Sequence, residues 1–197
     1  MASIRKTGIA GASVTWLLAC GHPPTRTTGA SPSPELPGRL PLARAFVLEA
    51  AGAMPDDTAV TVPPGQSRVV VLRRSAPDFG LFAWLELPDS SLQRTPGAAA
   101  RLLLHPRIGE YGLDLELPGT LRPGARLMFS YGSHFVAPAG ARERYGSDLL
   151  FEHELRIGLV HGDSEIEFLP TTRPGTDMLS AALPSPGPGR YLVVAPR

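Results

Sequence analysis

The sequence lacks several features on which common classes of protein depend. Its 197 residues include one cysteine, which excludes an intrachain disulfide and a zinc site built from CxxC pairs. The formal net charge is only +1, without the basic bias of a nucleic-acid-binding domain. There is no P-loop or GxGxxG motif for a nucleotide and no GxSxG motif for a nucleophilic serine. No uncharged apolar run reaches the roughly 18 residues of a transmembrane helix. We therefore expect no cofactor, nucleotide or nucleic acid.

The first 20 residues have the layout of an export signal. Arg5 and Lys6 form a basic start, and residues 7–18 follow without a charge. This run is too short for a helix across a roughly 30 Å hydrocarbon core, but it suits the apolar region of a signal peptide. Glycines within the run, and Pro23 and Pro24 after it, disfavour a buried helix of the folded domain.

The segment Leu17-Leu18-Ala19-Cys20 closes this leader and resembles the lipobox of bacterial lipoproteins. The resemblance implies that the Cys20 thiol carries a diacylglyceryl group and that a signal peptidase cuts after Ala19. Acyl chains, each CH₂ contributing roughly 0.8 kcal/mol, would then hold the protein on the membrane. In such lipoproteins an Asp after the cysteine favours the inner membrane, so Gly21 favours the outer membrane of the cell envelope. The alternative is a chance cysteine at an ordinary signal cleavage site.

Residues 20–43 are expected to form a flexible, lipid-anchored linker. Most residues between Gly21 and Pro41 are Pro, Gly, Ser or Thr, and such a stretch cannot bury enough apolar surface to fold. A Pro-rich chain rises about 3.1 Å per residue, so this spacer reaches up to about 60 Å. One domain is expected over residues 44–197.

Beyond the linker, short β-type runs alternate with Gly- and Pro-rich turns. This pattern predicts an all-β fold, an antiparallel β-sandwich. In the run from Leu113 to Leu117, leucine alternates with acid, so one face of that strand should be buried. Residues 58–62 and 68–72 flank a Pro-Gly turn and predict a hairpin. The remaining expected strands are residues 45–48, 81–87, 101–104, 126–131 and 190–195.

Two stretches carry a further resemblance. LRPGARLMFSY (121–131) and PGPGRYLVVA (186–195) are similar to strand–turn–strand segments of bacterial immunoglobulin-like domains. The resemblance covers about two strands and implies an immunoglobulin-like arrangement of the sandwich.

Residues 148–160 fit two secondary structures. A strand would place on one face Phe151, His153, Leu155, Ile157 and Leu159. A helix capped by Ser147 or Asp148 would instead align Leu149, Leu150, His153, Ile157 and Val160. Gly158 and the β-rich surroundings favour the strand.

Imidazole and carboxylate groups cluster between residues 134 and 167. These groups suit zinc or copper, so the candidate metal ligands are His134, His153, His161 and Asp163. His153 and His161 are eight residues apart and lack the spacing of an HExxH pair. The acidic residues around them are of a kind that commonly forms the solvated face of a sheet. An envelope metal-binding protein or hydrolase using these residues is therefore the alternative function, and no catalytic residue is assigned.

The segment 133–145 is the best candidate for a long functional loop, because binding residues concentrate on loops carried by rigid sheets. Its candidate binding residues are His134, Phe135, Arg142, Arg144 and Tyr145. The alternation of Phe129 with Tyr131 favours the core for these two rings. The aromatic side chains that could stack on sugar or peptide are Trp84, Tyr111, Phe129, Tyr131, Phe135 and Tyr145. We expect a non-catalytic binding or structural domain whose partner is another envelope protein or a polysaccharide.

Overall fold

The computed structural model describes residues 38–93, 99–132 and 135–197. The proposed leader, with Leu17, Leu18, Ala19 and Cys20, lies outside these residues, as does His134. The chain divides into two units, residues 1–35 and 36–197, and the account below concerns the second. Within the described residues no helix is long and apolar enough to cross a membrane.

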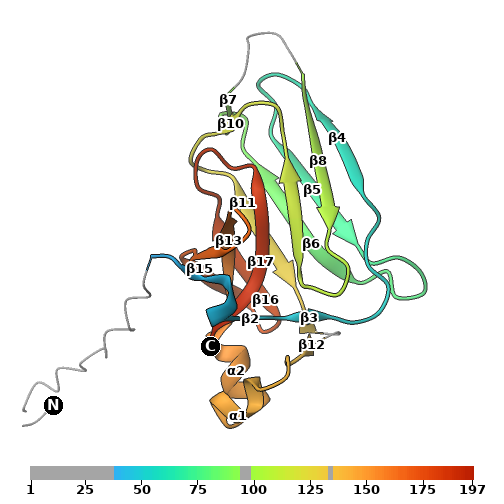
Figure 1. Cartoon of the computed structure of the whole chain (residues 1–197). Helices are drawn as coiled ribbons and strands as arrows, with labels where there is room; N and C mark the ends of the chain where they lie inside the picture. Colours follow the sequence, from blue (N-terminus) through green and yellow to red (C-terminus); the bar gives the residue numbers. More distant parts are fainter. Residues whose placement is uncertain (1–37, 94–98, 133–134) are drawn as a thin grey trace, which may run out of the picture. The chain divides into compact units, whose positions relative to one another are not determined.

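One antiparallel sheet is built mainly from the two ends of the domain. Its hydrogen-bonded order is β1-β14-β13-β17-β9-β8-β4, and β2 also pairs with β17 (Figure 1). The strands are β1 (Leu40–Pro41), β2 (Ala45–Val47), β4 (Thr58–Val62), β8 (Ala100–Pro106), β9 (Gly112–Glu116), β13 (Arg156–His161), β14 (Glu165–Phe168) and β17 (Gly189–Pro196). A short 3-10 helix, Leu42–Arg44, joins β1 to β2.

The second large sheet has the order β15-β16-β11-β6-β5 and is also antiparallel. Its strands are β5 (Arg68–Arg73), β6 (Leu81–Leu87), β11 (Arg126–Ser130), β15 (Thr171–Gly175) and β16 (Met178–Ala182). Two minor pairs are β3 (Glu49–Ala50) with β12 (Phe135–Val136), and β7 (Leu92–Gln93) with β10 (Thr120–Leu121). The predicted all-β antiparallel sandwich is confirmed, and its immunoglobulin-like character stays a prediction.

The core lies between the two large sheets and follows the alternation of the sequence. Leu113 and Leu115 of β9 are buried, as are Leu127 and Phe129 of β11, while the intervening acids of β9 face outward. A second buried cluster covers the outer face of β13, β14 and β17, where Leu40 and Leu42 pack against it. The first strand therefore begins at Leu40, within the stretch expected to be linker.

The predicted hairpin of residues 58–62 with 68–72 is wrong. β4 pairs with β8, whereas β5 pairs with β6, so residues 63–67 carry the chain from one sheet to the other. Val62 and Val70 are both buried, and they enter the same core from opposite sides. The alternation of buried and exposed residues is the same in a hairpin and in such an arch, so the sequence pattern did not separate them.

Residues 148–160 combine both predicted structures. Helix α2 spans Asp148–Glu154, and strand β13 follows after Leu155, so the favoured strand is wrong for the first half of the segment. Ser147 caps α2 as the helix hypothesis expected, because its hydroxyl accepts a hydrogen bond from the backbone N–H of Leu150. The expected helical stripe is also wrong, because α2 buries Phe151 and leaves Leu150 exposed.

Candidate functional site

A helical cap stands at one end of the sandwich, beside β3 and β12 (Figure 1). It consists of α1 (Ala141–Tyr145) and α2. Phe151 of α2 is fully buried and meets three other aromatic rings, with centroids 6.1 Å from Phe46, 6.0 Å from Phe135 and 5.7 Å from Tyr145. This aromatic cluster fixes the cap to the sandwich.

Within the described residues, the predicted binding loop forms β12 beside the cap and helix α1 of the cap. Phe135 and Tyr145 belong to the aromatic cluster, and the Tyr145 hydroxyl donates to the backbone carbonyl of Pro196, so neither ring is a free stacking platform. Arg142 forms a bidentate ion pair with Asp148. Both Arg142 and Arg144 are exposed, and the Arg144 guanidinium lies 5.8 Å from the Tyr145 ring.

The other aromatic side chains proposed for stacking are mostly interior. Tyr111, Phe129 and Tyr131 are fully buried, so these three rings are part of the core. Trp84 is half-buried on the five-stranded sheet, and its indole N–H has no partner among the described residues. A stacking site for sugar or peptide therefore finds no exposed ring among these four.

Between α2 and the β15–β16 hairpin, a polar network joins the cap to the sandwich. Arg173 of β15 donates to the Tyr131 hydroxyl at 2.8 Å and to the backbone carbonyls of Glu152 and Leu155. The Tyr131 hydroxyl in turn donates to the Glu152 carboxylate at 3.1 Å. Arg173 thus satisfies carbonyls at the C-terminal end of α2, where a cation is also favoured by the helix dipole.

Burial raises the pKa of Tyr131 to about 12, because the phenolate would lose its solvation. The Arg173 guanidinium opposes this shift and the Glu152 carboxylate reinforces it. Tyr131 therefore stays neutral at physiological pH. It serves as a hydrogen-bonding bridge and has no use there as a base.

Two hollows flank α2. The first has a volume of about 440 Å³ and is lined by residues 135–140 with Arg142 and Asp148. The second, of about 270 Å³, lies between α2 and the β15–β16 hairpin. Its walls combine the apolar side chain of Leu149 with polar groups of His153 and Arg173. A ligand here would meet an apolar surface next to hydrogen-bond donors, an arrangement common in binding sites.

Exposed apolar side chains concentrate around the same helix. The neighbouring residues Leu149 and Leu150 of α2 are 62% and 55% exposed. Val136 of β12, beside the first hollow, is 38% exposed. Of the seven large apolar side chains that lie exposed in the described residues, two therefore belong to the cap and a third lies beside it.

The three proposed metal ligands within the described residues, His153, His161 and Asp163, are not brought together. His153 is on α2, whereas His161 is the last residue of β13, a strand whose six residues extend about 16 Å at 3.3 Å per residue. Metal–nitrogen bonds of roughly 2 Å do not span this distance. His161 instead contacts the Glu167 carboxylate at 2.7 Å. Among the described residues no group of three His, Cys, Asp or Glu side chains is placed to hold a metal.

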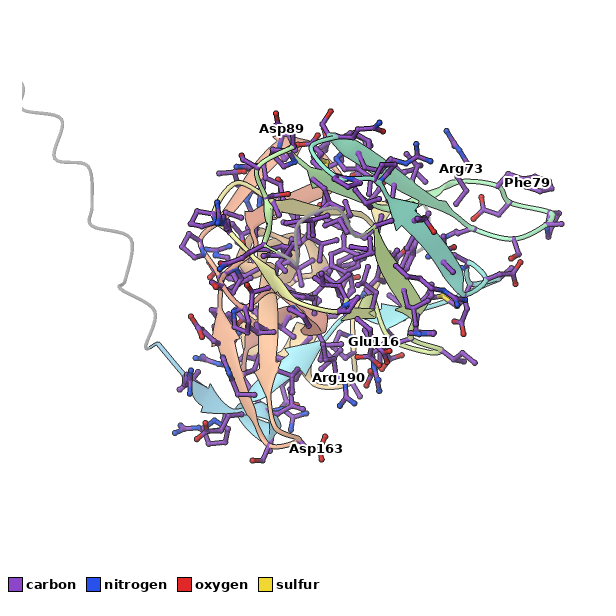
Figure 2. All side chains as sticks on the ribbon, turned by 90° about the horizontal axis from the view of Figure 1, so that it is seen from above. Arg73, Phe79, Asp89, Glu116, Asp163 and Arg190 are labelled. Atoms are coloured by element: carbon purple, nitrogen blue, oxygen red, sulfur yellow. The ribbon has the colours of Figure 1, made fainter. Side chains whose placement is uncertain are left out.

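Asp163 belongs to a different surface, the charged part of the eight-stranded sheet. Its carboxylate lies 3.8 Å from Arg190, which also contacts Asp114 at 3.1 Å. Asp114 is shared with Arg107, so charges of opposite sign alternate across β9 and β17. Figure 2 shows Asp163 and Arg190 on the same side of the domain as Glu116. Apart from Asp163, the side chains of these pairs are partly exposed to solvent, and each pair contributes little stability.

Sequence reasoning missed Arg173, which does most to organise the second hollow. It lies in a run of Thr171 to Gly175 that reads as a turn because Pro174 and Gly175 follow it directly. An isolated arginine in such a run carries no local pattern. Its role depends on Tyr131 and α2, which are distant in sequence.

Comparison of the chain with family models, with curated proteins and with solved structures finds no match. The function is therefore argued from the residues and the geometry of the domain.

Proposed function

We propose that this chain is a lipid-anchored binding protein of the bacterial cell envelope, acylated at Cys20 and located at the outer membrane. The Leu17-Leu18-Ala19-Cys20 segment, after a basic start and a short apolar run, supports the anchor. The Pro-rich stretch that follows would hold the sandwich away from the bilayer.

Intact mass of the membrane-extracted protein tests the anchor. Wild type should begin at Cys20 and carry added acyl mass, and the Cys20→Ser variant should lack both. An unmodified full-length chain in the soluble fraction would contradict the anchor and the envelope location together.

Binding at the helical cap is supported above all by one observation, the pairing of two hollows with the exposed Leu149 and Leu150 of α2. Exposed apolar surface beside a hollow is typical of a docking site. The polar groups nearby are occupied in holding the cap, since Glu152 accepts from Tyr131 and Arg173 donates to backbone carbonyls. This favours binding over catalysis.

The ligand chemistry follows from the walls of the second hollow. An apolar body would pack on Leu149, and an anionic group would be attracted by the positive charge of Arg173 and would lie near His153. A segment of another envelope protein fits this combination.

An aromatic sulfonate, 1-anilinonaphthalene-8-sulfonate, is a suitable probe, because it joins an apolar ring system to an anion. Its fluorescence should rise on the wild-type protein and fall for a Leu149→Asp, Leu150→Asp variant. Ile108→Asp is the matched control, because Ile108 is 91% exposed on the β8–β9 turn, outside both hollows. Equal fluorescence from all three proteins would contradict binding at the cap.

A further inference from the structure

Strand β5 is an edge of the five-stranded sheet. In the described part of the chain it pairs with β6 alone, through residues from Arg68 to Arg73, with a register shift between Leu72 and Arg73. The six residues contain no proline or glycine and no acid. An edge strand offers a row of backbone N–H and C=O groups to an additional strand, and proteins commonly shorten, cover or bulge such edges.

The outward face of β5 is apolar in its middle. Val69 is 58% exposed and Val71 is 46% exposed, while Val70 and Leu72 between and beside them are buried in the core. Val71 lies directly opposite Trp84 of β6, which continues this surface onto the next strand. A strand added beside β5 would therefore gain apolar contacts on its outer face as well as backbone hydrogen bonds.

Each end of β5 carries an exposed arginine. Within the described residues, neither Arg68 nor Arg73 lies within 4.0 Å of a carboxylate, and Arg73 has only a 3.5 Å contact to the Phe79 carbonyl. Figure 2 shows Arg73 and Phe79 projecting from the molecule on the side away from Asp163. At about 3.3 Å per residue, the two guanidinium-bearing positions lie roughly 17 Å apart along the strand.

We propose that β5 receives an extended segment of another polypeptide, with apolar residues opposite Val69 and Val71 and acidic residues opposite Arg68 and Arg73. The recognition mode is β-strand addition, in which backbone bonds supply affinity and side chains supply selectivity. The surface is independent of the helical cap and so goes beyond the function proposed above.

The charges select this partner over a second copy of the chain. Antiparallel self-pairing about Val70 keeps Val69 opposite Val71 of the other copy and preserves the buried and exposed faces. In that register Arg68 lies opposite Leu72 and Arg73 lies opposite Ser67 of the other copy, so neither arginine gains an acidic partner. An acid-flanked segment instead offers each arginine an ion pair.

The peptide Ac-ETVTVE-NH₂ matches this register when it runs antiparallel to β5, and Ac-KTVTVK-NH₂ is its charge-reversed control. Binding to the full chain in detergent, followed by fluorescence anisotropy of labelled peptide, should favour the acidic peptide by about tenfold at low salt. The preference should shrink as salt is added, because exposed ion pairs are screened.

An Arg68→Glu, Arg73→Glu variant should reverse this preference. Arg101→Glu, Arg144→Glu is the matched control, because it changes the net charge equally at two exposed arginines on β8 and α1. The control should keep the acidic preference. If both double variants change the preference alike, the effect is one of net charge and the proposal fails.

N-methylation provides a second test that needs no protein variant. Methyl groups on alternate residues of Ac-ETVTVE-NH₂ block the amides of one edge, so of the two possible peptides one should lose binding and the other should keep it. Equal loss or equal retention would overturn strand addition. A stable dimer of the protein without peptide, held through β5, would show that a second copy is the occupant and would overturn the proposed partner.

Discussion

Replacing Phe151 with alanine tests how the helical cap is attached. Phe151 is fully buried on α2, and its ring meets Phe46, Phe135 and Tyr145 at centroid distances of 5.7 to 6.1 Å. Truncation of a buried phenylalanine removes its transfer free energy and leaves a cavity, at a cost of about 3–5 kcal/mol. Since one kcal/mol shifts the melting temperature of a domain this size by about 2–4 °C, the expected loss is roughly 6–20 °C.

Urea denaturation and thermal melting monitored by circular dichroism measure this loss. Leu150→Ala is the matched control, because the neighbouring side chain is 55% exposed and its removal should cost no more than about 0.5 kcal/mol. The pair separates the observed helix from the stripe that the sequence suggested, in which Leu150 is buried. A Phe151→Ala loss below about 1 kcal/mol, or a larger loss for Leu150→Ala, would refute the reasoning.

Three further predictions concern charged and titratable groups. Arg74→Met should lower the free energy of unfolding by about 3 kcal/mol in denaturation experiments, because the buried guanidinium donates to Tyr111 and to two backbone carbonyls. The control Arg73→Met should lower it by about 0.5 kcal/mol or less. All four tyrosines have a pKa raised above 10, chiefly by burial, so absorbance at 295 nm should show no ordinary tyrosine step while the protein is folded. The folded state then holds the tyrosine protons more tightly than the unfolded chain does. The stability that these groups contribute is therefore complete below about pH 10 and falls as the pH rises further. An ordinary tyrosine absorbance step near pH 10 in the folded protein would contradict this. The pKa of His105 should lie above 6.5 by NMR titration, because its ring contacts the Asp57 carboxylate at 2.8 Å, and Asp57→Asn should lower this pKa. The small stability that this exposed pair contributes is present below the pKa of the histidine in the unfolded chain. It is lost as the pH rises through the pKa of His105 in the folded protein.

Most strands were predictable because their own side chains carry the alternation. Leucines at positions 113 and 115 enter the core of β9 while the acids face out, and β6, β11 and β17 follow similar local patterns. The strands β14 to β16 were missed. Glu165-Ile166-Glu167-Phe168 was treated as part of a polar cluster, although its alternation matches a strand, and Pro174 disguised β15. Residues 40–41 were hidden by the Pro-rich composition around them, since their strand exists only against β14.

The candidate site was predictable only in its location. The sequence placed interest on residues 133–167, and the helical cap and the first hollow lie there, whereas the second hollow is also lined by Arg173, Gly175 and Thr176. The individual roles were different, because Phe135 and Tyr145 anchor the cap and Arg142 pairs with Asp148. Such roles depend on which distant side chain lies opposite, and neighbouring letters in the sequence do not contain that information.

The sequence by itself determined the all-β class and the expectation of a lipidated leader, because local alternation, turn residues and a short motif are read from adjacent positions. Only the tertiary structure decided which strands share a sheet, because a hairpin and an arch bury the same residues. It also separated His153 from His161 by the length of β13 and joined Arg173 to Tyr131 across 42 positions of the chain. It left β5 as an edge, because pairing is a property of the whole sheet and the strand's own residues do not fix its place there.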